Sequence, residues 1–405
     1  MEKYKLSDLF EKPISGEWGN ELEEGKKGTK VLRTTNFTNI GRIDFSDVVE
    51  RDIDLEKYSS KILKKGDIII EKSGGSPTQP VGRVIYFDKE DEVYLCNNFT
   101  AILRPNERIY PKFALYLMMR LHQTKKVMKF QNKTTGIINL KLNDYIETTK
   151  VNIPSIETQK KIAEVLDKAQ YLIDKKKEQI DLLDELVKSG FIDMFGDPMI
   201  NPYNWETIEL KEIMKEKAMN GFFAKNTEYK EDGNSQVMWL GDVINRRYSN
   251  TKGLKRVDVT EKELEKYRVK YGDLLFCRSS LTKEGIGKAS AVPQNIENNI
   301  MFECHIIKVN LDLEKCIPEF MQIQSSMDYF RNQIMSKSKT ATMTTIGQEG
   351  IVTNKVILPP LEKQKIFVEF IRKIDEIKSK METSISELED NFNSLMQKAF
   401  KGELF

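Results

Sequence analysis

Apolar residues recur at helical spacing through two long stretches of this chain. Between Glu157 and Phe195 they fall alternately four and three positions apart, which is the spacing of a coiled-coil seam. The seam positions are Ile162, Leu166, Ala169, Ile173, Lys176, Ile180, Leu183 and Val187. A helix of about 39 residues would be about 58 Å long, because each residue adds about 1.5 Å. The pattern predicts one long helix in the middle of the chain.

The same pattern returns near the end of the chain. Gln159 is repeated as Gln364, and Pro154 is repeated as Pro359, about 205 residues later. The later seam positions are Phe367, Ile371, Ile374, Lys378, Met381, Ile385, Leu388, Phe392, Leu395 and Ala399. We expect the two helices to pack on each other. A two-fold repeat favours an antiparallel pair, and the alternative is that each helix only covers its own domain.

The repeat extends beyond the helices, in the same order and at nearly the same offset. The matched positions are Leu6 with Leu210, Gly66-Asp67 with Gly272-Asp273, Gly82-Arg83 with Gly287-Lys288, and Ile156-Glu157 with Leu361-Glu362. Solenoid repeats usually run about 20 to 50 residues, so a repeat this long indicates a duplicated domain. Two copies in one chain predict a molecule with pseudo-two-fold symmetry.

Ahead of its long helix, the first copy mixes short β-type runs with turn signals. Asp67–Ile70 and Arg83–Phe87 are examples of the runs, and Gly74-Gly75-Ser76-Pro77 is a turn signal. An amphipathic helix is expected from Phe113 to Lys125, with its apolar stripe inward and its lysines outward. The predicted fold class is α+β, with two tandem domains joined by two long antiparallel coiled-coil helices. The predicted parts are a first domain over 1–153, a central helix over 154–195, a linker over 196–207, a second domain over 208–358 and a distal helix over 359–405.

Composition limits the chemistry that this chain can carry. At 405 residues and 39% hydrophobic content it fits a globular protein of two or three domains. No apolar run reaches about 18 residues, so we expect a cytoplasmic protein. The four cysteines have no short paired spacing and the two histidines lie in different copies, so neither a metal site nor a Ser-His-Asp site is expected.

Positive charge is local in this chain, whose net charge is only +2. Between Arg104 and Lys133 the single acid Glu107 stands among eight basic residues: Arg104, Arg108, Lys112, Arg120, Lys125, Lys126, Lys129 and Lys133. The second copy carries its basic residues elsewhere, at Arg246, Arg247, Lys252, Lys255 and Arg256. Such runs indicate either a nucleic-acid surface or an ordinary solvated face.

Two segments of each copy could approach a DNA duplex closely. The first follows the strand after the repeated Gly-Asp pair, as Lys72-Ser73-Gly74-Gly75-Ser76 and again as Arg278-Ser279-Ser280. The second is the hydroxyl-rich Lys133-Thr134-Thr135-Gly136 and its counterpart Lys339-Thr340-Ala341-Thr342. A repeated strand frame with divergent loops is typical of two readers of different targets, and the alternative is a variable surface loop.

Catalytic motifs do not support an enzyme. Asn201-Pro202-Tyr203 is only faintly similar to the Asn/Asp-Pro-Pro-Tyr/Phe motif of amino-methyltransferases, because it lacks the second proline and a nearby glycine-rich cofactor loop. Ser73-Gly74-Gly75-Ser76 lacks the Gly-Lys-Ser/Thr ending of a phosphate-binding loop. We therefore expect no catalytic residues, no cofactor and no metal.

Taken together, these motifs resemble the specificity (S) subunit of type I restriction-modification systems over nearly the whole chain. The resemblance rests on residues 153–159 (IPSIETQ) and their repeat 358–364 (LPPLEKQ), and on the helix endings Phe195-Gly196-Asp197 and Phe400-Lys401-Gly402-Glu403-Leu404. Lys65-Gly66-Asp67-Ile68 and Tyr271-Gly272-Asp273-Leu274-Leu275 are also typical. Ser155 departs from the repeat, since Pro360 stands in its place.

The resemblance implies two target-recognition domains that each read half of a bipartite double-stranded DNA sequence, with the two helices acting as a ruler. It implies that two copies of an adenine-N6 methyltransferase (M) subunit bind the helices and supply the S-adenosylmethionine binding and the base flipping, and that ATP-driven restriction (R) subunits can join. The chain itself would have no activity. The alternatives are a single-chain restriction-methylation enzyme and a coiled-coil scaffold without DNA readout.

The predicted DNA-binding residues divide between base readers and phosphate contacts. Lys125, Lys126 and Lys129 are expected to bind phosphate, whereas Arg83 and Arg278 are candidates for base contacts. The full predicted set is Lys72, Ser73, Gly74, Gly75, Ser76, Arg83, Lys125, Lys126, Lys129, Lys133, Thr134, Thr135, Arg246, Arg247, Arg278, Ser279, Ser280, Lys288, Lys339, Thr340 and Thr342.

Overall fold

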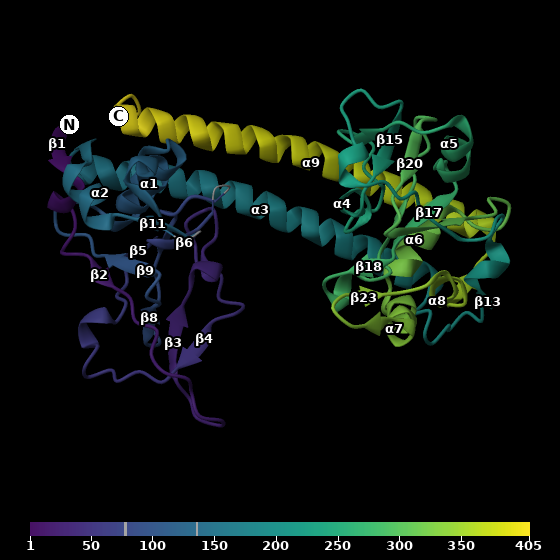
Figure 1. Ribbon diagram of the computed structural model, residues 1–405, viewed down its shortest axis with the longest axis horizontal. Coiled ribbons are helices and arrows are strands. Elements are labelled where there is room, and N and C mark those ends of the chain that lie inside the picture. Colours follow the sequence, from purple (N-terminus) through teal and green to yellow (C-terminus); the bar gives the residue numbers. More distant parts are fainter. Residues whose placement is uncertain (77–78, 135–136) are drawn as a thin grey trace. The chain divides into compact units, whose positions relative to one another are not determined.

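The structure, a computed structural model, describes residues 1–76, 79–134 and 137–405, and for Lys133 and Thr134 only the backbone. The chain divides into two compact units (Figure 1). Unit 1 comprises Met1–Lys177 and Thr383–Phe405, and unit 2 comprises Glu178–Glu382. Each unit therefore holds one α+β domain and a part of both long helices.

The described residues of unit 1 form three sheets and a strand pair. The four-stranded sheet has the order β2 (Ile14–Ser15), β9 (Thr100–Leu103), β5 (Ile68–Glu71), β7 (Val84–Tyr86). The three-stranded sheets have the orders β4 (Val49–Arg51), β3 (Thr29–Leu32), β8 (Tyr94–Cys96), and β10 (Gln131–Thr134), β11 (Ile137–Leu140), β6 (Ser73–Gly75). The pair is β1 (Glu2–Lys5) with β12 (Lys150–Ile153). The consecutive isoleucines of β5 are all buried, as expected for a strand with neighbours on both sides.

Unit 2 repeats the same strand order throughout. Its four-stranded sheet runs β14 (Met219–Asn220), β21 (Ile306–Asn310), β17 (Asp273–Cys277), β19 (Ala289–Ala291). Its three-stranded sheets run β16 (Lys255–Val257), β15 (Ser235–Met238), β20 (Ile300–Phe302), and β22 (Lys339–Thr340), β23 (Thr344–Thr345), β18 (Ser279–Ser280). The pair is β13 (Glu206–Glu209) with β24 (Lys355–Leu358). The predicted duplication is therefore present in the topology as well as in the sequence.

The two predicted long helices are α3 (Ile156–Phe195) and α9 (Leu361–Lys401). In unit 1 Lys177 of α3 binds Glu389 of α9 at 2.7 Å, and in unit 2 Asp184 of α3 binds Lys378 of α9 at 2.7 Å. Residue numbers rise along α3 while those of their partners fall along α9. The helices are therefore antiparallel, and the predicted fold class is confirmed. The boundaries predicted for the functional domains stay a prediction.

The repeated proline-to-glutamine motif fastens each long helix to its domain. In unit 1 Gln159 accepts a hydrogen bond from the backbone N–H of Tyr110 at 2.7 Å and donates to the carbonyls of Arg108 and Pro154. In unit 2 Gln364 makes the same three bonds, with Ile317, Lys315 and Pro359. Both glutamines are buried, so the repeated spacing from proline to glutamine has a structural cause.

The remaining helices belong to the α+β parts of the two units. Unit 1 has α1 (Pro111–Gln123) and α2 (Leu142–Thr148), and unit 2 has α4 (Leu240–Val243), α5 (Glu261–Tyr267), α6 (Pro318–Ser326), α7 (Asp328–Lys337) and α8 (Gln348–Val352). The 3₁₀ helices are η1 (Leu6–Asp8), η2 (Thr34–Asn36), η3 (Ser59–Lys61), η4 (Lys126–Phe130), η5 (Leu210–Ile213), η6 (Asn226–Glu228) and η7 (Lys283–Gly285).

The predicted amphipathic helix differs from α1 in one respect. Most of α1 is buried, including Leu115, Met118 and Met119, so it is a core helix whose single lysine, Lys112, is partly buried against Asp167. The exposed lysines come after it, because Lys125 adopts a left-handed conformation (φ 57°) that ends the helix ahead of η4.

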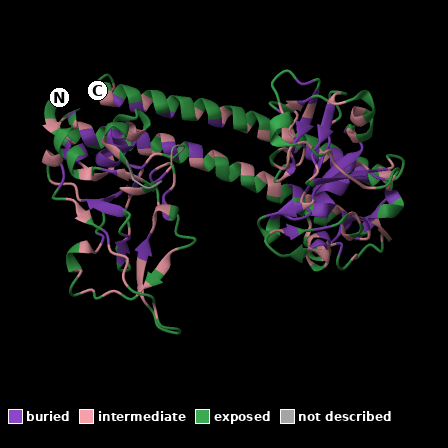
Figure 2. Ribbon diagram, in the orientation of Figure 1, coloured by how far each residue is buried: buried purple, intermediate pink, exposed green. Residues whose placement is uncertain are grey.

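Aromatic side chains join the long helices to the core of unit 2. Phe191 and Phe195 near the end of α3 contact Phe320 of α6 and Phe367 of α9, with ring centroids 5.1 to 5.6 Å apart. Figure 2 shows buried positions concentrated on the strands and α6 of this unit. In unit 1 Phe113 of α1 packs on Phe400 of α9 at 5.2 Å. Each domain thus packs on the start of one long helix and on the end of the other.

Among the residues that the structure describes, no helix combines the length and the apolar character needed to span a bilayer. All four cysteines are free thiols; Cys96, Cys277 and Cys316 are buried.

Candidate DNA interface

The two loop segments predicted separately in unit 1 form a single sheet. Strand β11 pairs with β10 on one side and with β6 on the other, so that Asn139 lies opposite both Asn132 and Ser73. The segment from Lys72 to Ser76 therefore lies beside the hydroxyl-rich hairpin. The backbone of Lys133 and Thr134 belongs to β10, whereas Thr135 and Gly136 lie outside the described residues.

Unit 2 builds the equivalent sheet from its own two segments. Ser279 and Ser280 of β18 pair with Thr345 and Thr344 of β23, and Lys339 and Thr340 of β22 pair with the same two threonines. Lys339, Thr340 and Thr342 are all exposed. We name the sheet β10–β11–β6 the first reader sheet and the sheet β22–β23–β18 the second reader sheet.

The two glycines of the first reader sheet have different structural roles. Gly74 is exposed and adopts φ +99°, a conformation that side-chain-bearing residues rarely take. Gly75 is buried, and a Cβ there would lie 2.7 Å from Val81 and 2.9 Å from the carbonyl of Gln79. Beside them the hydroxyl of Ser73 bonds the amide oxygen of Asn139, and the backbone of Ser76 bonds Gln79. The segment is held rigidly by its own contacts.

Lys72 is half-buried at the base of the first reader sheet. Its ammonium donates to the hydroxyl of Ser15, and burial lowers its pKa. Its backbone N–H donates to the carbonyl of Phe99 at 2.9 Å. In unit 2 the N–H of Arg278 donates to the carbonyl of His305 at 2.8 Å, and its guanidinium donates to the carbonyl of Cys304. Lys72 and Arg278 are therefore structurally equivalent.

The serines of the second reader sheet are less accessible than the sequence suggested. Ser279 and Ser280 are only 7% and 8% exposed, and the hydroxyl of Ser280 accepts from the N–H of Thr282. The next residue, Leu281, is 83% exposed and was missed by sequence reasoning. Phe99 and His305, exposed at the turns beside the two sheets, were missed as well. Phe99 follows Asn97-Asn98, and His305 follows Glu303-Cys304, in each case between two strand patterns. These short polar pairs could have indicated the turns.

Arg83 is held inside unit 1 rather than presented at its surface. Its guanidinium makes two bonds of 3.0 Å to Glu71 and also donates to the carbonyls of Phe37 and Thr34. The side chains of Arg83 and Glu71 are 15% and 4% exposed. A base contact by Arg83 would have to break this ion pair.

The predicted phosphate-binding lysines Lys125, Lys126 and Lys129 are exposed on and just before η4. This 3₁₀ helix is anchored by Val127, which packs closely on Gly82. It leads directly into β10, so the three lysines lie next in the chain to the first reader sheet.

Three predicted residues of unit 2 line one cavity of about 460 Å³, namely Arg246, Arg247 and Lys288. Arg247 is fixed by Asp184 of α3 and Asp375 of α9, with its side chain 12% exposed. The ammonium of Lys288 donates to Asn245 at 2.6 Å. The structure thus brings these three residues together at the cavity, and none of them belongs to a strand of the second reader sheet.

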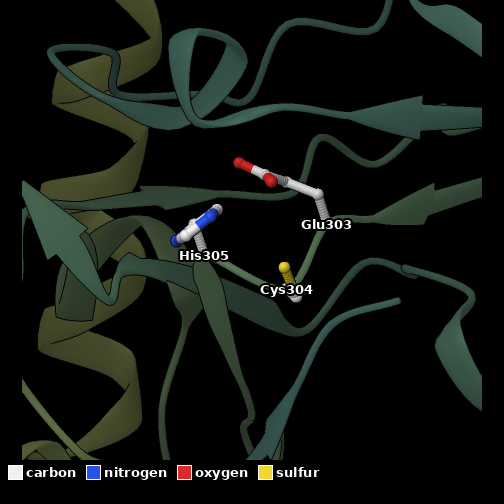
Figure 3. A group of neighbouring side chains, drawn as sticks. All are labelled: Glu303, Cys304 and His305. Carbon is white, nitrogen blue, oxygen red and sulfur yellow. The ribbon is translucent and has the colours of Figure 1, made fainter. Parts of the chain in front are cut away.

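Glu303, Cys304 and His305 form a group with metal-ligand chemistry at the turn between β20 and β21 (Figure 3). Their ligand atoms lie within 4.8 Å of one another. Burial raises the pKa of the Glu303 carboxyl and of the Cys304 thiol, which favours the protonated forms that bind metals poorly. The carboxylate side chain already accepts the N–H of Leu240. We therefore assign no metal to this turn.

The duplicated domain and the paired long helices define a protein of two tandem domains that share one strand order. Residues 1–184 and 202–390 match the family described as the type I restriction modification DNA specificity domain. The chain belongs to this family, which confirms the resemblance seen in its sequence and its class as a specificity subunit. Neither the single-chain enzyme nor the scaffold without DNA readout gains support.

The chain is similar to named members of this class. It is 24% identical over 394 residues to the specificity subunit of the type I restriction enzyme EcoKI of Escherichia coli (strain K12), covering 92% of this chain and 82% of that protein. It is 25% identical over 397 residues to the StySPI specificity subunit of Salmonella potsdam, with the same coverage. A solved structure concerning complex assembly and conformational transition of the type I R-M system shares the fold, with a TM-score of 0.56, 14% identity, and coverage of 100% of this chain and 98% of that one.

Proposed function

We propose that this chain reads a bipartite double-stranded DNA sequence and positions methyltransferase (M) subunits, and in a complete system restriction (R) subunits, on it. The observation that carries this proposal is the pair of reader sheets. Their strand order is the same in both units, but their exposed residues differ. A common frame with different side chains is what two readers of different half-sites require.

Within unit 1, we assign base reading to the first reader sheet and phosphate binding to η4. Lys72, Ser73, Gly74 and Ser76 are at or near the strand β6, where a Cβ on Gly74 would meet only the ring of Phe99, at 4.0 Å, so a ligand can approach the backbone closely. Lys125, Lys126 and Lys129 would neutralise backbone phosphates whatever the sequence. The buried Gly75 packs against Val81, and Arg83 is ion-paired with Glu71, the residue before Lys72.

Within unit 2, we assign base reading to the exposed residues of the second reader sheet. Lys339, Thr340 and Thr342 offer an ammonium and hydroxyl groups, and Arg278 and Leu281 lie on or beside β18. Arg278 retains donors for a base edge, because only one of its nitrogens is engaged by a carbonyl in the described part of the chain. Ser279 and Ser280 hold the strand in place.

The long helices provide a surface for the methyltransferase partner. Helix α3 exposes large apolar side chains that a folded monomer would otherwise bury, at Tyr171, Leu172, Leu182 and Leu186. We assign these residues to the partner interface. Since the DNA and the methyltransferase would be met inside the cell, we place the complex in the cytoplasm.

Selection of binding sites from randomised duplex DNA tests this proposal, using the chain assembled with its methyltransferase partner. The expected product is a sequence with two defined halves and a fixed gap. Thr340→Ala with Thr342→Ala should relax only one half, by roughly 1–3 kcal/mol of discrimination. Lys126→Ala, the matched surface control in unit 1, should weaken all sequences alike and reduce the salt dependence of binding.

Two results would reject the assignment. Selection of no sequence at all by the assembled complex would favour the scaffold. A threonine variant that weakens every sequence equally would remove the second reader sheet from base reading while leaving DNA binding itself intact.

A further inference from the structure

Unit 2 contains a basic cavity that the reading of DNA by the two sheets does not use. Its volume is about 460 Å³, within the range of small-ligand sites. It is lined by the loop from Asn245 to Arg247, by Lys288 and Ala289 at the start of β19, by α6 and α7, and by the long helices. All of these residues belong to unit 2.

The duplicated domain shows that the fold does not need this cavity. Tyr110 and Ile317 precede α1 and α6 and are held by the same glutamine contact, so positions along the two helices correspond. Leu115, Met118 and Met119 of α1 then match Gln322, Ser325 and Ser326 of α6. In unit 1 the loop at Gly41 packs directly on Leu115 and Met119. A Cβ on Gly41 would lie only 2.8 and 2.9 Å from their side chains, which is too close. The cavity that remains there is about 140 Å³.

A second difference between the units concerns the carboxylate partner of a basic side chain, which is present in unit 1 and missing among the described residues of unit 2. In unit 1 the backbone N–H of Glu71 bonds the carbonyl of Arg83, and their side chains form an ion pair. The equivalent backbone bond in unit 2 joins Cys277 to Lys288, so the carboxylate is replaced by a thiol. The ammonium of Lys288 has only the neutral Asn245 as a hydrogen-bond partner among the described residues.

Arg331 of α7 adds a second cation without a carboxylate partner in the described part of the chain. Its Nη2 donates to the carbonyl of Glu284 at 3.1 Å, while its Nη1 is buried and lacks an acceptor among the described residues. Arg246 is exposed at the rim. Asp184 is engaged by Arg247 and Lys378, and Oδ1 of Asp375 is engaged by Arg247, whereas Oδ2 of Asp375 is buried without a partner among the described residues. These two carboxylates balance the charges of Arg247 and Lys378, and Arg246, Lys288 and Arg331 remain without a carboxylate partner in the described part of the chain.

The cavity also presents a buried acceptor. Gln322 is 7% exposed; its amide nitrogen donates to the carbonyl of Ala289 at 3.1 Å, and its Oε1 has no donor among the described residues. A buried polar atom of this kind favours a ligand with an N–H or O–H group. The site is therefore complementary to a molecule that carries both an anionic group and a hydrogen-bond donor.

We propose that this cavity binds a phosphorylated ligand of mononucleotide size, with its phosphate held by Lys288 and Arg331 and a hydroxyl or amino group donating to Gln322. Arginine and lysine are the usual phosphate-binding side chains, and the buried guanidinium still has a free donor. The phosphate can come from a free nucleotide or from a DNA strand. The inference is independent of base reading by the two sheets.

Calorimetric titration of the purified full-length chain tests the proposal, with adenosine monophosphate, inorganic phosphate and a short duplex of unrelated sequence as separate probes. Saturable binding of adenosine monophosphate, weakened at least tenfold by Lys288→Gln and by Arg331→Gln, is expected for a free nucleotide. Lys262→Gln, on the exposed surface of α5 in the same unit, is the matched control and should change nothing in this titration.

Each other outcome has a definite meaning. Binding of the duplex alone, weakened by both variants of the cavity, would assign the phosphate to DNA. No binding of any probe, or binding that both variants leave unchanged, would overturn the proposal. Should the variants fail to fold, mass spectrometry of wild-type chain treated with phenylglyoxal gives the answer: the proposal requires adenosine monophosphate or duplex to slow modification of Arg331, and no slowing by either would reject it.

Discussion

At the scale of single residues, charge in this protein divides between structural pairs and exposed side chains. Arg83 and Arg247 are both held by carboxylates inside their units, whereas Lys126 and Lys339 are exposed. A buried ion pair stabilises little by itself but is costly to break, because the remaining charge is left without a partner. The paired arginines are therefore expected to affect folding more than binding.

Arg83→Ala should lower the free energy of unfolding by about 3 kcal/mol, because it leaves the buried carboxylate of Glu71 without its partner. Urea denaturation measures this change. Glu71→Cys combined with Arg83→Lys, which copies the equivalent positions of unit 2, should cost less than Arg83→Ala. A stable Arg83→Ala protein with relaxed readout of one half-site would instead make Arg83 a base reader.

At the scale of elements, the repeated motif at the start of each long helix serves to attach that helix to its domain. Gln159 satisfies three backbone groups in unit 1, and Gln364 satisfies the equivalent three in unit 2. The charged contacts nearby are reversed between the units. Lys112 faces Asp167 at 3.6 Å in unit 1, and Glu319 faces Arg372 at 3.5 Å in unit 2. The glutamine contact is thus the common element, and the charges are particular to each unit.

Gln159→Leu should destabilise the protein by about 3 kcal/mol, since it leaves the N–H of Tyr110 and two carbonyls without their partner. Gln364→Leu should have a similar effect in unit 2. Thermal unfolding of both variants, with Gln397→Leu on the surface of α9 as the control, measures the difference. A loss under 1 kcal/mol in both variants would mean that these bonds are not what fastens the helices.

The elements also show what could be predicted from the sequence. The long helices and the duplication could be predicted because heptad spacing and the matched motifs are local patterns along the chain. The pairing of Ser73 with Asn139 could not, because strand pairing between distant residues leaves no local pattern. For the same reason the Arg83–Glu71 pair and the burial of Ser279 and Ser280 were not foreseen. The candidate residues were found by composition, but the fold was needed to show which of them are exposed and which are buried or ion-paired.

At the scale of the whole molecule, α3 and α9 connect the two units, because each contributes residues to both. Their antiparallel pairing is fixed by side-chain contacts on either side of the division between the units. If these helices set the distance between the half-sites, then their length determines the gap in the DNA sequence.

Inserting one heptad of the same apolar pattern after Lys177 in α3 and after Glu382 in α9 should lengthen that gap by about three base pairs. Seven residues add about 10 Å to a helix, and one base pair of B-DNA adds about 3.4 Å. Site selection by the assembled complex measures the gap. Insertion in α3 alone is the control and should abolish binding, because it shifts one seam against the other. An unchanged gap in the double insertion would rule out the helices as the ruler.

The most direct test of the central claim is the position of N6-methyladenine in a genome where this chain is expressed with its methyltransferase partner. We predict methylation of one split motif, with two short defined halves and a fixed gap, that disappears when this chain is deleted. Replacing residues 208–358 by the corresponding segment of another family member should change only one half. Methylation that persists without the chain, or that follows a continuous short motif, would contradict the assignment of sequence reading to this protein.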